Sequence, residues 1–341
     1  MIEYPNRLDI VFDKLKNYNA KPIIVGGFVR DSLLNIKSKD IDIEVYNLTS
    51  YEKLEKILKE FGHINLVGKS FGICKLDLDD LDLDFSLPRK DNKVSSGHRG
   101  FSVDIDSSLS FKQAASRRDF TINAMGYDPM KKKLFDPFDG KKDLEKKVLK
   151  AVDLKSFSED PLRVLRGVVF CARFEFEMSD KLKKLCSKMI EDKMLDELPT
   201  QRVFEEIKKI LTKAKKPSIG FTLLKELSKN SLLNLKKDLF REFLKLTDKI
   251  PTLKLTQKQL NKLTNTILTI INDSTCQDKL QKELTKITNP PPILQGRDLI
   301  ELGLTPSKKF SVILDKAYQA QIKGEFKEII GAKKYLKRLL T

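Results

Sequence analysis

The sequence predicts an α+β protein in which a front part with strands and helices precedes a long helical part. In the first 150 residues, short runs that alternate between apolar and polar side chains lie between helical stretches. After about residue 150 these strand patterns stop, and apolar residues recur with the spacing of helices. The chain has 341 residues, which is enough for two or three domains that each bury a core.

The front part contains four predicted strands and two predicted helices. Strands are expected at residues 22–28, 40–47, 71–76 and 81–87, and the first of them ends in a glycine turn. Helices are expected at residues 29–35 and 51–61. Residues 88–100 are polar, charged and contain glycine, so we predict a mobile loop there.

The remainder of the chain is predicted to be helical. Apolar residues at helical spacing predict helices at residues 161–174, 179–193, 202–213, 221–229, 236–246, 257–271 and 277–287. Three prolines within residues 289–292 predict a rigid linker or turn, and a final helical piece is expected from 296 to 340.

The positive charge of the chain is concentrated in this helical part. Residues 206–341 hold 28 Lys and Arg against 13 Asp and Glu, and the whole chain has a net charge of +17. A nearly neutral front part joined to a basic back part indicates chemistry in one and binding of a polyanion in the other. The alternative is a lysine-rich proteome, in which lysine covers every solvated helix face.

The composition argues against membrane proteins, secreted proteins and zinc proteins. No run of about 18 apolar residues is present, and the first residues lack the apolar stretch of a signal peptide, so the cytoplasm is the expected location. The four cysteines are far apart in the sequence and read as reduced, packed thiols: Cys74, Cys171, Cys186 and Cys276. Nothing in the sequence implies a protein partner.

Two carboxylates in the second predicted strand are candidate metal ligands. Asp40 and Asp42 are two residues apart, so both side chains point to the face opposite Ile41 and Ile43. Neighbouring carboxylates repel each other unless a cation neutralises them, and Mg²⁺ prefers such oxygen ligands. Asp84, in an acid-rich segment, is the candidate for a third catalytic carboxylate. Without other motifs, an exposed acidic strand face would be the better explanation of the pair.

A glycine pair precedes these acids by a dozen residues. Gly26 and Gly27 end the first predicted strand, where glycine lets the backbone approach a phosphate without a clash. Arg30 follows within the next helix and offers a fork of donors suited to a triphosphate. By itself this segment could also be a structural turn.

Together these segments resemble a known family. GGFVRD at residues 26–31, followed by DID at 40–42, resembles the signature of polymerase β-like nucleotidyltransferases, specifically class II CCA-adding enzymes and bacterial poly(A) polymerases. Four further segments resemble family motifs and occur in the family's order: RRDFTINAMG at 117–126, EDPLRVLR at 159–166, PTQRVFEEI at 199–207 and LQGRDLIELGL at 294–304. The resemblance covers most of the chain.

The resemblance implies a domain organisation and an activity. It predicts a catalytic nucleotidyltransferase head at residues 1–148, a helical nucleotide-selecting neck at 149–215, and a basic helical RNA-binding body and tail at 216–341. The implied reaction is the addition of C and A nucleotides to the 3′ end of tRNA from CTP and ATP, with Mg²⁺. The alternatives are a poly(A) polymerase, an enzyme that adds only CC or only A, and a non-catalytic RNA-binding protein.

The resemblance also assigns nucleotide-binding residues. Asp160, Arg163 and Arg166 are spaced by threes, and Ser158 as N-cap with Pro161 in the first turn would place all three on one helix face. A carboxylate beside a guanidinium matches the base edges of both C and A, which is the role the family gives to Asp160 and Arg163. Arg118 is implied to contact the nucleotide.

Asp119 and Asn123 are implied to hold the ribose. Two residues depart from the family pattern: Val169 replaces a frequent arginine, and Gln201 replaces a usual glutamate. Some family members carry a phosphohydrolase domain built on histidine. This chain has only His63 and His98, both in the front part, so a histidine-based metal site in the back part is excluded.

Overall fold

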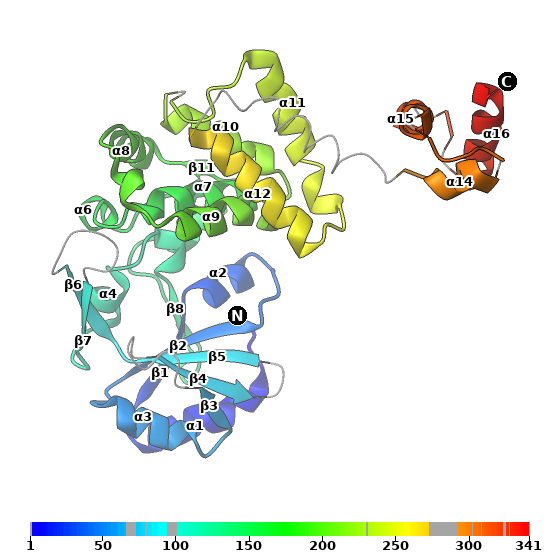
Figure 1. Ribbon diagram of the computed structural model, residues 1–341. Coiled ribbons are helices and arrows are strands. Elements are labelled where there is room, and N and C mark those ends of the chain that lie inside the picture. Colours follow the sequence, from blue (N-terminus) through cyan, green and yellow to red (C-terminus); the bar gives the residue numbers. More distant parts are fainter. Residues whose placement is uncertain are drawn as a thin grey trace.

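The computed structural model describes residues 2–65, 73–78, 81–93, 101–229, 231–272, 292–301, 303–307, 309–322, 325–326 and 328–340. A head with a mixed sheet precedes a part in which most described residues are helical, and the last helix ends at Leu340 (Figure 1). The predicted α+β class is therefore confirmed.

The head is built on a seven-stranded sheet with the order β3-β4-β5-β2-β1-β8-β9. Its strands are β1 (Lys21–Val25), β2 (Asp40–Tyr46), β3 (His63–Asn65), β4 (Ile73–Leu78), β5 (Leu81–Ser86), β8 (Gly126–Asp128) and β9 (Lys133–Phe135). Strands β2 and β5 pair in parallel, whereas β1 is antiparallel to both β2 and β8. The parallel pair lies at the centre, so the residues of β2 are fixed in register from both sides.

The alternating pattern of β2 places its acids on one face of this sheet. Ile41 and Ile43 are almost fully buried, whereas Asp40 and Asp42 are exposed. The apolar side chains pack into the main core, and the acids point to the opposite face because successive side chains alternate along a strand. This agrees with the orientation expected from the sequence.

The helices of the head cover the sheet on two sides. They are α1 (Asp9–Asn17), α2 (Gly27–Leu33), α3 (Tyr51–Leu58), α4 (Phe111–Ala115) and α5 (Gly140–Glu145), with 3-10 turns η1 (Asn6–Leu8) and η3 (Thr121–Asn123). In Figure 1, α1 and α3 lie on one side of the sheet, and α2 lies on the side that faces the helical part. Residues from α2 can therefore reach both the sheet and the following domain.

The loop predicted for residues 88–100 is partly wrong. Strand β6 (Arg89–Lys93) pairs with β7 (Phe101–Ile105) in an antiparallel two-stranded sheet. Pairing with a partner strand satisfies the backbone of this polar segment, and its composition alone did not reveal that partner. Residues 94–100, with His98, lie outside the described residues, so the prediction is not tested there.

The helices after the head follow the predicted order. They are α6 (Leu154–Phe157), α7 (Leu162–Phe174), α8 (Asp180–Glu191), α9 (Thr200–Lys213), α10 (Pro217–Leu227), α11 (Lys237–Thr247) and α12 (Gln257–Asn272), with 3-10 turns η4 (Met194–Glu197) and η5 (Ile250–Thr252). Two short strands not expected here, β10 (Val148–Leu149) and β11 (Glu177–Met178), pair in parallel at the end of the head.

Helix α7 begins later than predicted. Ser158 caps no long helix; it follows the short α6, and its hydroxyl donates to the carbonyl of Lys155. Pro161 is the N-cap of α7, which starts at Leu162. Because proline has no backbone N–H, a helix cannot continue through it with full hydrogen bonding. Asp160 therefore lies just before α7 rather than on it.

The C-terminal residues form a separate small core. The final predicted helical piece contains three helices, α14 (Gly296–Glu301), α15 (Lys309–Ile322) and α16 (Ile329–Leu340). Leu294, Leu299 and Leu336 belong to a cluster distinct from the main core. Figure 1 shows these helices apart from the others. The predicted helix at 277–287 lies outside the described residues. Within the described part, no helix is long and apolar enough to cross a membrane.

Gly140 offers a test of how tightly the head is packed. A methyl group at this position would lie 2.3 Å from the backbone oxygen of Thr121, which cannot move without disturbing η3. We expect Gly140→Ala to lower the free energy of unfolding by about 1–3 kcal/mol, measured by urea denaturation. Gly27→Ala is the control, because its methyl group would meet only the Arg30 side chain, at 3.5 Å. Equal stability of both variants would contradict this packing.

Candidate functional site

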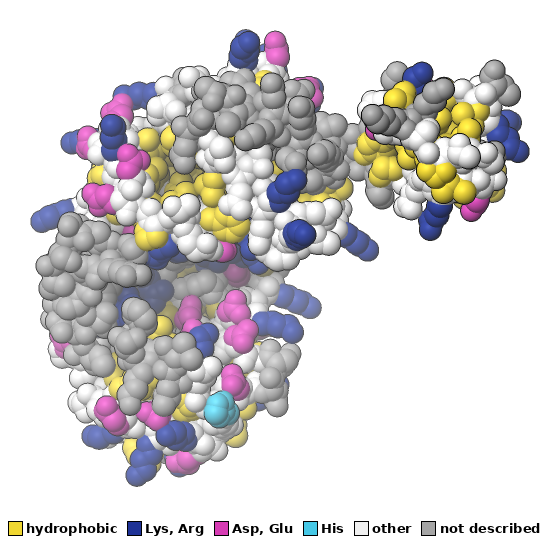
Figure 2. All heavy atoms as spheres, viewed as in Figure 1, with side chains coloured by type: hydrophobic (Ala, Val, Ile, Leu, Met, Phe, Trp, Pro, Cys, Tyr) yellow, Lys and Arg dark blue, Asp and Glu magenta, His cyan; other side chains and the backbone are white. Residues whose placement is uncertain are grey.

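The structure gathers most of the predicted site residues around one cavity between the head and α7. The cavity has a volume of about 370 Å³. Its lining residues are Gly26, Gly27, Arg30, Asp42, Arg118, Asp119, Asn123, Asp160, Arg163, Arg166 and Phe170. Every residue predicted to bind nucleotide is in this set. Asp40 and Asp84 are not. Figure 2 shows basic side chains gathered in the hollow between the two parts, above acidic ones on the head.

The turn after β1 requires glycine at its first position. Gly26 has φ 70° and ψ −127°, a combination that side-chain-bearing residues rarely adopt. A methyl group there would lie 2.8 Å from Nη1 of Arg118 and 3.6 Å from Oδ2 of Asp42. The bare backbone of Gly26 therefore lets an arginine and a carboxylate approach the same point of the turn.

The acids of β2 and β5 lie next to each other across the parallel strands. Asp42 is in register with Asp84, and Asp40 is in register with Asp82. Water reaches Asp42 through the cavity, but the protein around it limits hydration. This burial raises the pKa of Asp42, and the charges of Asp84, Glu44 and Asp40 raise it further against the effect of nearby Arg118.

These carboxylates supply the hard oxygen donors that a divalent cation prefers. The mutual repulsion at Asp42 is the electrostatic condition that such a cation would relieve. Asp84 also has a cation beside it, because Oδ1 lies 3.2 Å from Nζ of Lys75. Within the described residues, no three His, Cys, Asp or Glu side chains are arranged around one point to hold a metal.

Glu44 is a site residue that the sequence analysis missed. It is buried, two residues beyond Asp42, on the same face of β2. Its Oε1 accepts from Arg118 at 2.9 Å and from Arg117 at 3.2 Å. Burial would raise the pKa of Glu44, but the two guanidinium groups outweigh it and lower the pKa. Glu44 thus orients Arg118 toward the cavity. The same two-residue alternation that relates Asp40 and Asp42 could have identified it.

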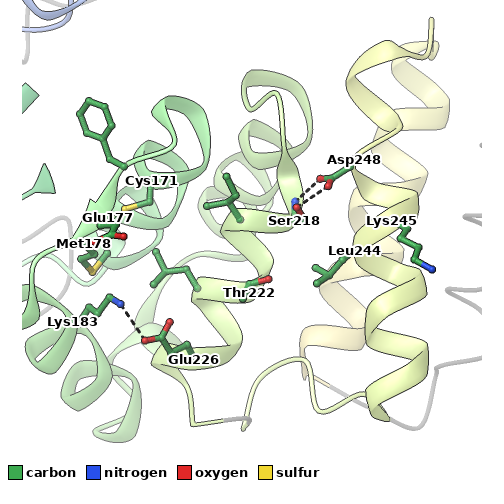
Figure 3. A pocket seen from close by; sticks show the side chains of 13 residues that line it. Cys171, Glu177, Met178, Lys183, Ser218, Thr222, Glu226, Leu244, Lys245 and Asp248 are labelled. Atoms are coloured by element: carbon green, nitrogen blue, oxygen red, sulfur yellow. Dashed lines mark hydrogen bonds and ion pairs between the residues drawn. The ribbon is translucent and has the colours of Figure 1, made fainter. Parts of the chain in front are cut away.

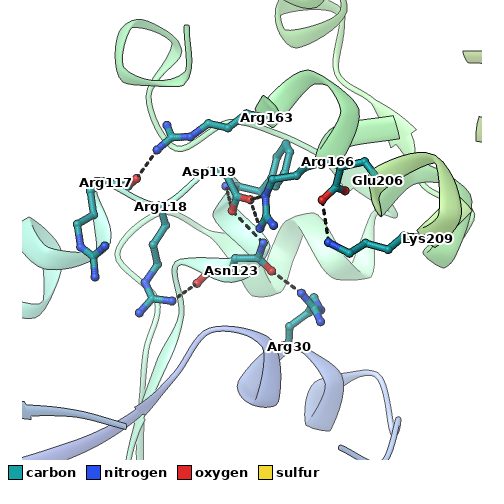
Figure 4. A network of polar contacts seen from close by, with 10 residues as sticks. Arg30, Arg117, Arg118, Asp119, Asn123, Arg163, Arg166, Glu206 and Lys209 are labelled. Atoms are coloured by element: carbon teal, nitrogen blue, oxygen red, sulfur yellow. Dashed lines mark hydrogen bonds and ion pairs between the residues drawn. The ribbon is translucent and has the colours of Figure 1, made fainter. Parts of the chain in front are cut away.

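Asp119 connects the head to α7. Its Oδ2 accepts two hydrogen bonds from Arg166, at 2.6 and 2.8 Å, and its Oδ1 accepts from the amide of Asn123 at 2.9 Å (Figure 4). Burial favours a raised pKa for Asp119, but Arg166 and these hydrogen bonds lower it. The carboxylate also accepts from the backbone N–H of Phe120 at 2.8 Å, so both of its oxygens have protein partners.

Arg30 is buried in the same network. Its Nη1 donates to Oδ1 of Asn123 at 2.6 Å, and its Nε donates to Oδ1 of Asp31 at 2.8 Å. Burial lowers the pKa of Arg30 against the opposing effect of Asp31. The side chain lines the cavity, but its donors serve protein partners, so the triphosphate contact expected from the sequence stays a prediction.

Asp160 and Arg163 stand at one edge of the cavity. Oδ1 of Asp160 accepts from the backbone N–H of Leu162 at 3.1 Å, at the start of α7. Arg163 donates to the carbonyl of Ser156 at 3.0 Å and to that of Arg117 at 2.9 Å. Two backbone carbonyls therefore hold the guanidinium of Arg163, and the carboxylate of Asp160 lines the same cavity.

The two departures from the family pattern have different surroundings. Val169 is buried within α7, and the neighbouring Phe170 lines the cavity, which the sequence analysis did not anticipate. Gln201 is exposed and donates to Glu205 at 3.0 Å within α9. Glu206, from the same helix, is buried. Burial lowers the pKa of Arg166, but Asp119 and, less strongly, Glu206 outweigh it and raise this pKa.

A second cavity, of about 440 Å³, lies among α7, α8, α10 and α11 (Figure 3). Four of its polar side chains form two pairs. Asp248 accepts from the backbone and hydroxyl of Ser218, both at 2.8 Å, and Lys183 pairs with Glu226 at 3.2 Å. None of the predicted site residues lines this cavity. Its contacts hold helices together.

Asp119→Asn tests whether this carboxylate holds the network. We expect a loss of about 2–3 kcal/mol in the free energy of unfolding at neutral pH, because Arg166 loses its ionic partner. The pKa of Asp119 is lower in the folded protein than in the unfolded chain. Its ionised form therefore stabilises the fold at pH values above the ordinary carboxyl pKa, and this stabilisation is lost as the pH falls through the lowered pKa. The difference from wild type, measured by urea unfolding at several pH values, should therefore shrink in acid.

Glu226→Gln is the control for this variant, because it removes a carboxylate from an exposed ion pair with Lys183. Its effect should stay below about 1 kcal/mol. An Asp119→Asn protein no less stable than this control would contradict the assigned role.

Curated relatives match about 60% of the chain. The chain is 34% identical over 213 residues to the "Multifunctional CCA protein" of Haemophilus ducreyi, covering 62% of this chain and 49% of the relative. It is 35% identical over 206 residues to the "CCA-adding enzyme" of Alteromonas mediterranea, covering 60% of this chain and 49% of the relative. The chain thus spans about half the length of the curated relatives it matches.

Solved structures share the fold over nearly the whole chain. The CCA-adding enzyme of Thermotoga maritima, complexed with tRNA, aligns with a TM-score of 0.62 at 22% identity, covering 100% of this chain and 97% of that one. A CCA-adding enzyme in complex with ATP aligns with a TM-score of 0.60 at 22% identity, covering 98% and 95%. Residues 23–150 match the model of the poly A polymerase head domain. This match covers the glycine turn, the acids of β2 and most of the sheet, so this part of the chain is similar to the poly A polymerase head domain.

Proposed function

We propose that this protein adds C and A nucleotides to the 3′ end of tRNA without a nucleic-acid template, using CTP and ATP and releasing pyrophosphate. The observation that carries the proposal is the single cavity that brings Gly26, Asp42 and Arg118 of the head to Asp160 and Arg163 at the start of α7. The names of the relatives, and the ATP and tRNA complexes of structures with this fold, support the same activity.

Asp40 and Asp42 are the proposed ligands of Mg²⁺, with Asp84 beside them on β5. A bound divalent ion would stabilise the charge on the attacking 3′-oxygen and on the pyrophosphate. The protein's own contribution is to hold the carboxylates on a rigid central strand, next to the turn at Gly26. Arg118, oriented by Glu44, then faces the triphosphate as a positive charge in a fixed position.

The base is proposed to be selected by Asp160 and Arg163. Cytosine and adenine both present an amino donor next to a ring-nitrogen acceptor, which a carboxylate and a guanidinium can match. Uracil and guanine present a carbonyl where the carboxylate needs a donor, so both would leave polar groups unpaired. Because backbone carbonyls hold Arg163 in place, the site needs little rearrangement before it reads a base.

The basic residues after the neck are proposed to bind the tRNA. Residues 206–341 carry 28 Lys and Arg against 13 Asp and Glu, and phosphate contacts of this kind weaken as salt increases. The proposed domains are a head at 1–148, a neck at 149–215, and a body with tail at 216–341. We place the reaction in the cytoplasm.

Extension assays test the reaction itself. Purified protein with Mg²⁺ should extend tRNAs that end before CCA, after C or after CC, given each NTP singly and together. We expect C from CTP on the first two substrates, A from ATP after CC, and then arrest. Extension only of the tRNA that ends in CC, with ATP, would indicate an A-adding enzyme. Extension limited to C would indicate a CC-adding enzyme. Unlimited addition of A to any RNA would indicate a poly(A) polymerase.

Asp42→Asn is the matched variant for that assay. It should reduce incorporation at least about 100-fold, because a metal supplies several kcal/mol of transition-state stabilisation. The affinity of this variant for tRNA should remain similar to that of wild type, since the carboxylate of Asp42 lines the cavity between the head and α7. Unchanged RNA-dependent function in this variant would point to a non-catalytic RNA-binding protein.

Asp160→Asn tests base selection. An amide offers both a donor and an acceptor, so the variant should lose about 10- to 100-fold in incorporation of CTP and ATP and gain in relative use of UTP and GTP. Single-nucleotide incorporation with each NTP measures both effects, with Glu226→Gln as the control carboxylate. Robust use of UTP or GTP by the wild-type protein would refute the base-reading role.

A further inference from the structure

A stack of aromatic and guanidinium groups joins α2 of the head to α7. The rings of Phe170 and Phe174 are nearly parallel, at 11°, with centroids 5.9 Å apart. Cζ of Arg30 lies 5.1 Å from the centroid of Phe170 and 4.9 Å from that of Phe174. Arg173 contacts the Phe174 ring at 4.7 Å, and Arg166 contacts the Phe170 ring at 5.7 Å. The buried head arginine is therefore held against two consecutive turns of α7.

Asp31, on α2 of the head, forms ion pairs with two arginines of this stack. Its Oδ1 binds Arg30, at 2.8 Å from Nε and 2.7 Å from Nη2. Its Oδ2 accepts from Nη2 of Arg173 at 3.1 Å. The side chains of Asp31 and Arg30 are only 7% and 5% exposed. One buried carboxylate thus bridges an arginine of α2 and an arginine near the end of α7.

The bridge continues into the cavity. Arg30 donates to Asn123, Asn123 donates to Asp119, and Asp119 accepts from Arg166. The series of contacts therefore starts and ends on α7, at Arg173 and Arg166, and passes through the head between them. Figure 4 shows Arg30, Asn123, Asp119 and Arg166 in this order.

Asp31, Arg173 and Phe174 do not line the cavity. Any effect that they have on a bound nucleotide passes through Arg30 and Asn123, which do line it. Buried ion pairs of this kind fix one geometry because a displaced partner leaves an uncompensated charge. A guanidinium that lies over two rings is restricted further.

We propose that Arg173, together with Asp31 and Phe174, is a positioning element that locks the head against α7 and so holds Arg30 and Asn123 in place for the nucleotide. This inference rests on the proposed function, and it adds residues outside the cavity to that site. It also gives Arg30 a holding role, because its Nε, Nη1 and Nη2 all serve Asp31 or Asn123.

Kinetics of Arg173→Gln on full-length protein test the proposal. A looser lock should raise KM for both CTP and ATP about tenfold, a typical size for coupling between neighbouring sites, with kcat changed less. A merely structural role would lower the active fraction, and hence kcat, without raising KM. Arg173→Lys keeps the charge opposite Asp31 and should recover part of the KM. Lys183→Gln, which breaks the ion pair with Glu226, is the matched control and should leave KM unchanged.

A double variant sharpens the result. Asp31→Asn and Arg173→Gln each remove one partner of the same contact, so the combined variant should raise KM no more than the worse single variant. If the increases in KM of the two single variants multiply in the combined variant, Asp31 and Arg173 act independently. That result would overturn the proposed positioning element.

Hydrogen exchange gives a readout that does not require catalysis. Amides of α2, residues Gly27–Leu33, should exchange faster in Arg173→Gln than in wild type or Lys183→Gln. If the wild-type protein extends no RNA, the proposed function fails. The positioning role of Arg173 is then still tested by hydrogen exchange in α2, measured while ATP or CTP is titrated. Unchanged exchange in α2 would overturn the lock even if the enzyme is active.

Discussion

The carboxylate of Asp119 is the constraint on which the site depends. It is buried where the head meets α7, and a charge in that position must be paired and hydrogen-bonded. Arg166 from α7 and Asn123 from the head meet both needs, so satisfying one carboxylate fixes the relation between two domains. Asp119 and Arg166 both line the cavity, so this pairing joins its two walls.

The charges around the cavity are arranged by sign as well as by position. Four arginines line it, and each is oriented by an acceptor of the protein: Arg30 by Asp31, Arg118 by Glu44, Arg163 by backbone carbonyls and Arg166 by Asp119. The carboxylates of β2 and β5 lie on neighbouring strands of the sheet, and that of Asp42 lines the same cavity. A nucleotide with its metal carries both signs of charge, and such a site could receive it without large rearrangement.

Local sequence patterns predicted the strand that carries the acids more accurately than they predicted the neighbouring elements. The two-residue alternation in β2 predicted which side Asp40 and Asp42 face, because a strand with one buried face has only one acceptable register. The same reasoning did not identify β6, whose polar residues form a strand only because β7 pairs with them. The N-cap of α7 was placed three residues early, at Ser158 instead of Pro161, because serine is a common N-cap and proline is common in a first helical turn.

The sequence by itself determined the division into a part with strands and a helical part, the glycine turn, the acids on β2 and most of the residues that line the cavity. These follow from periodicity and motif spacing, which are local properties of the chain. Only the tertiary structure decided the partners of those residues: Glu44 behind Arg118, Asp31 between Arg30 and Arg173, and Phe170 in the wall of the cavity. Asp31 and Arg173 are 142 residues apart in the chain, and their contact arises because packing of α2 against α7 buries charges that must find one another.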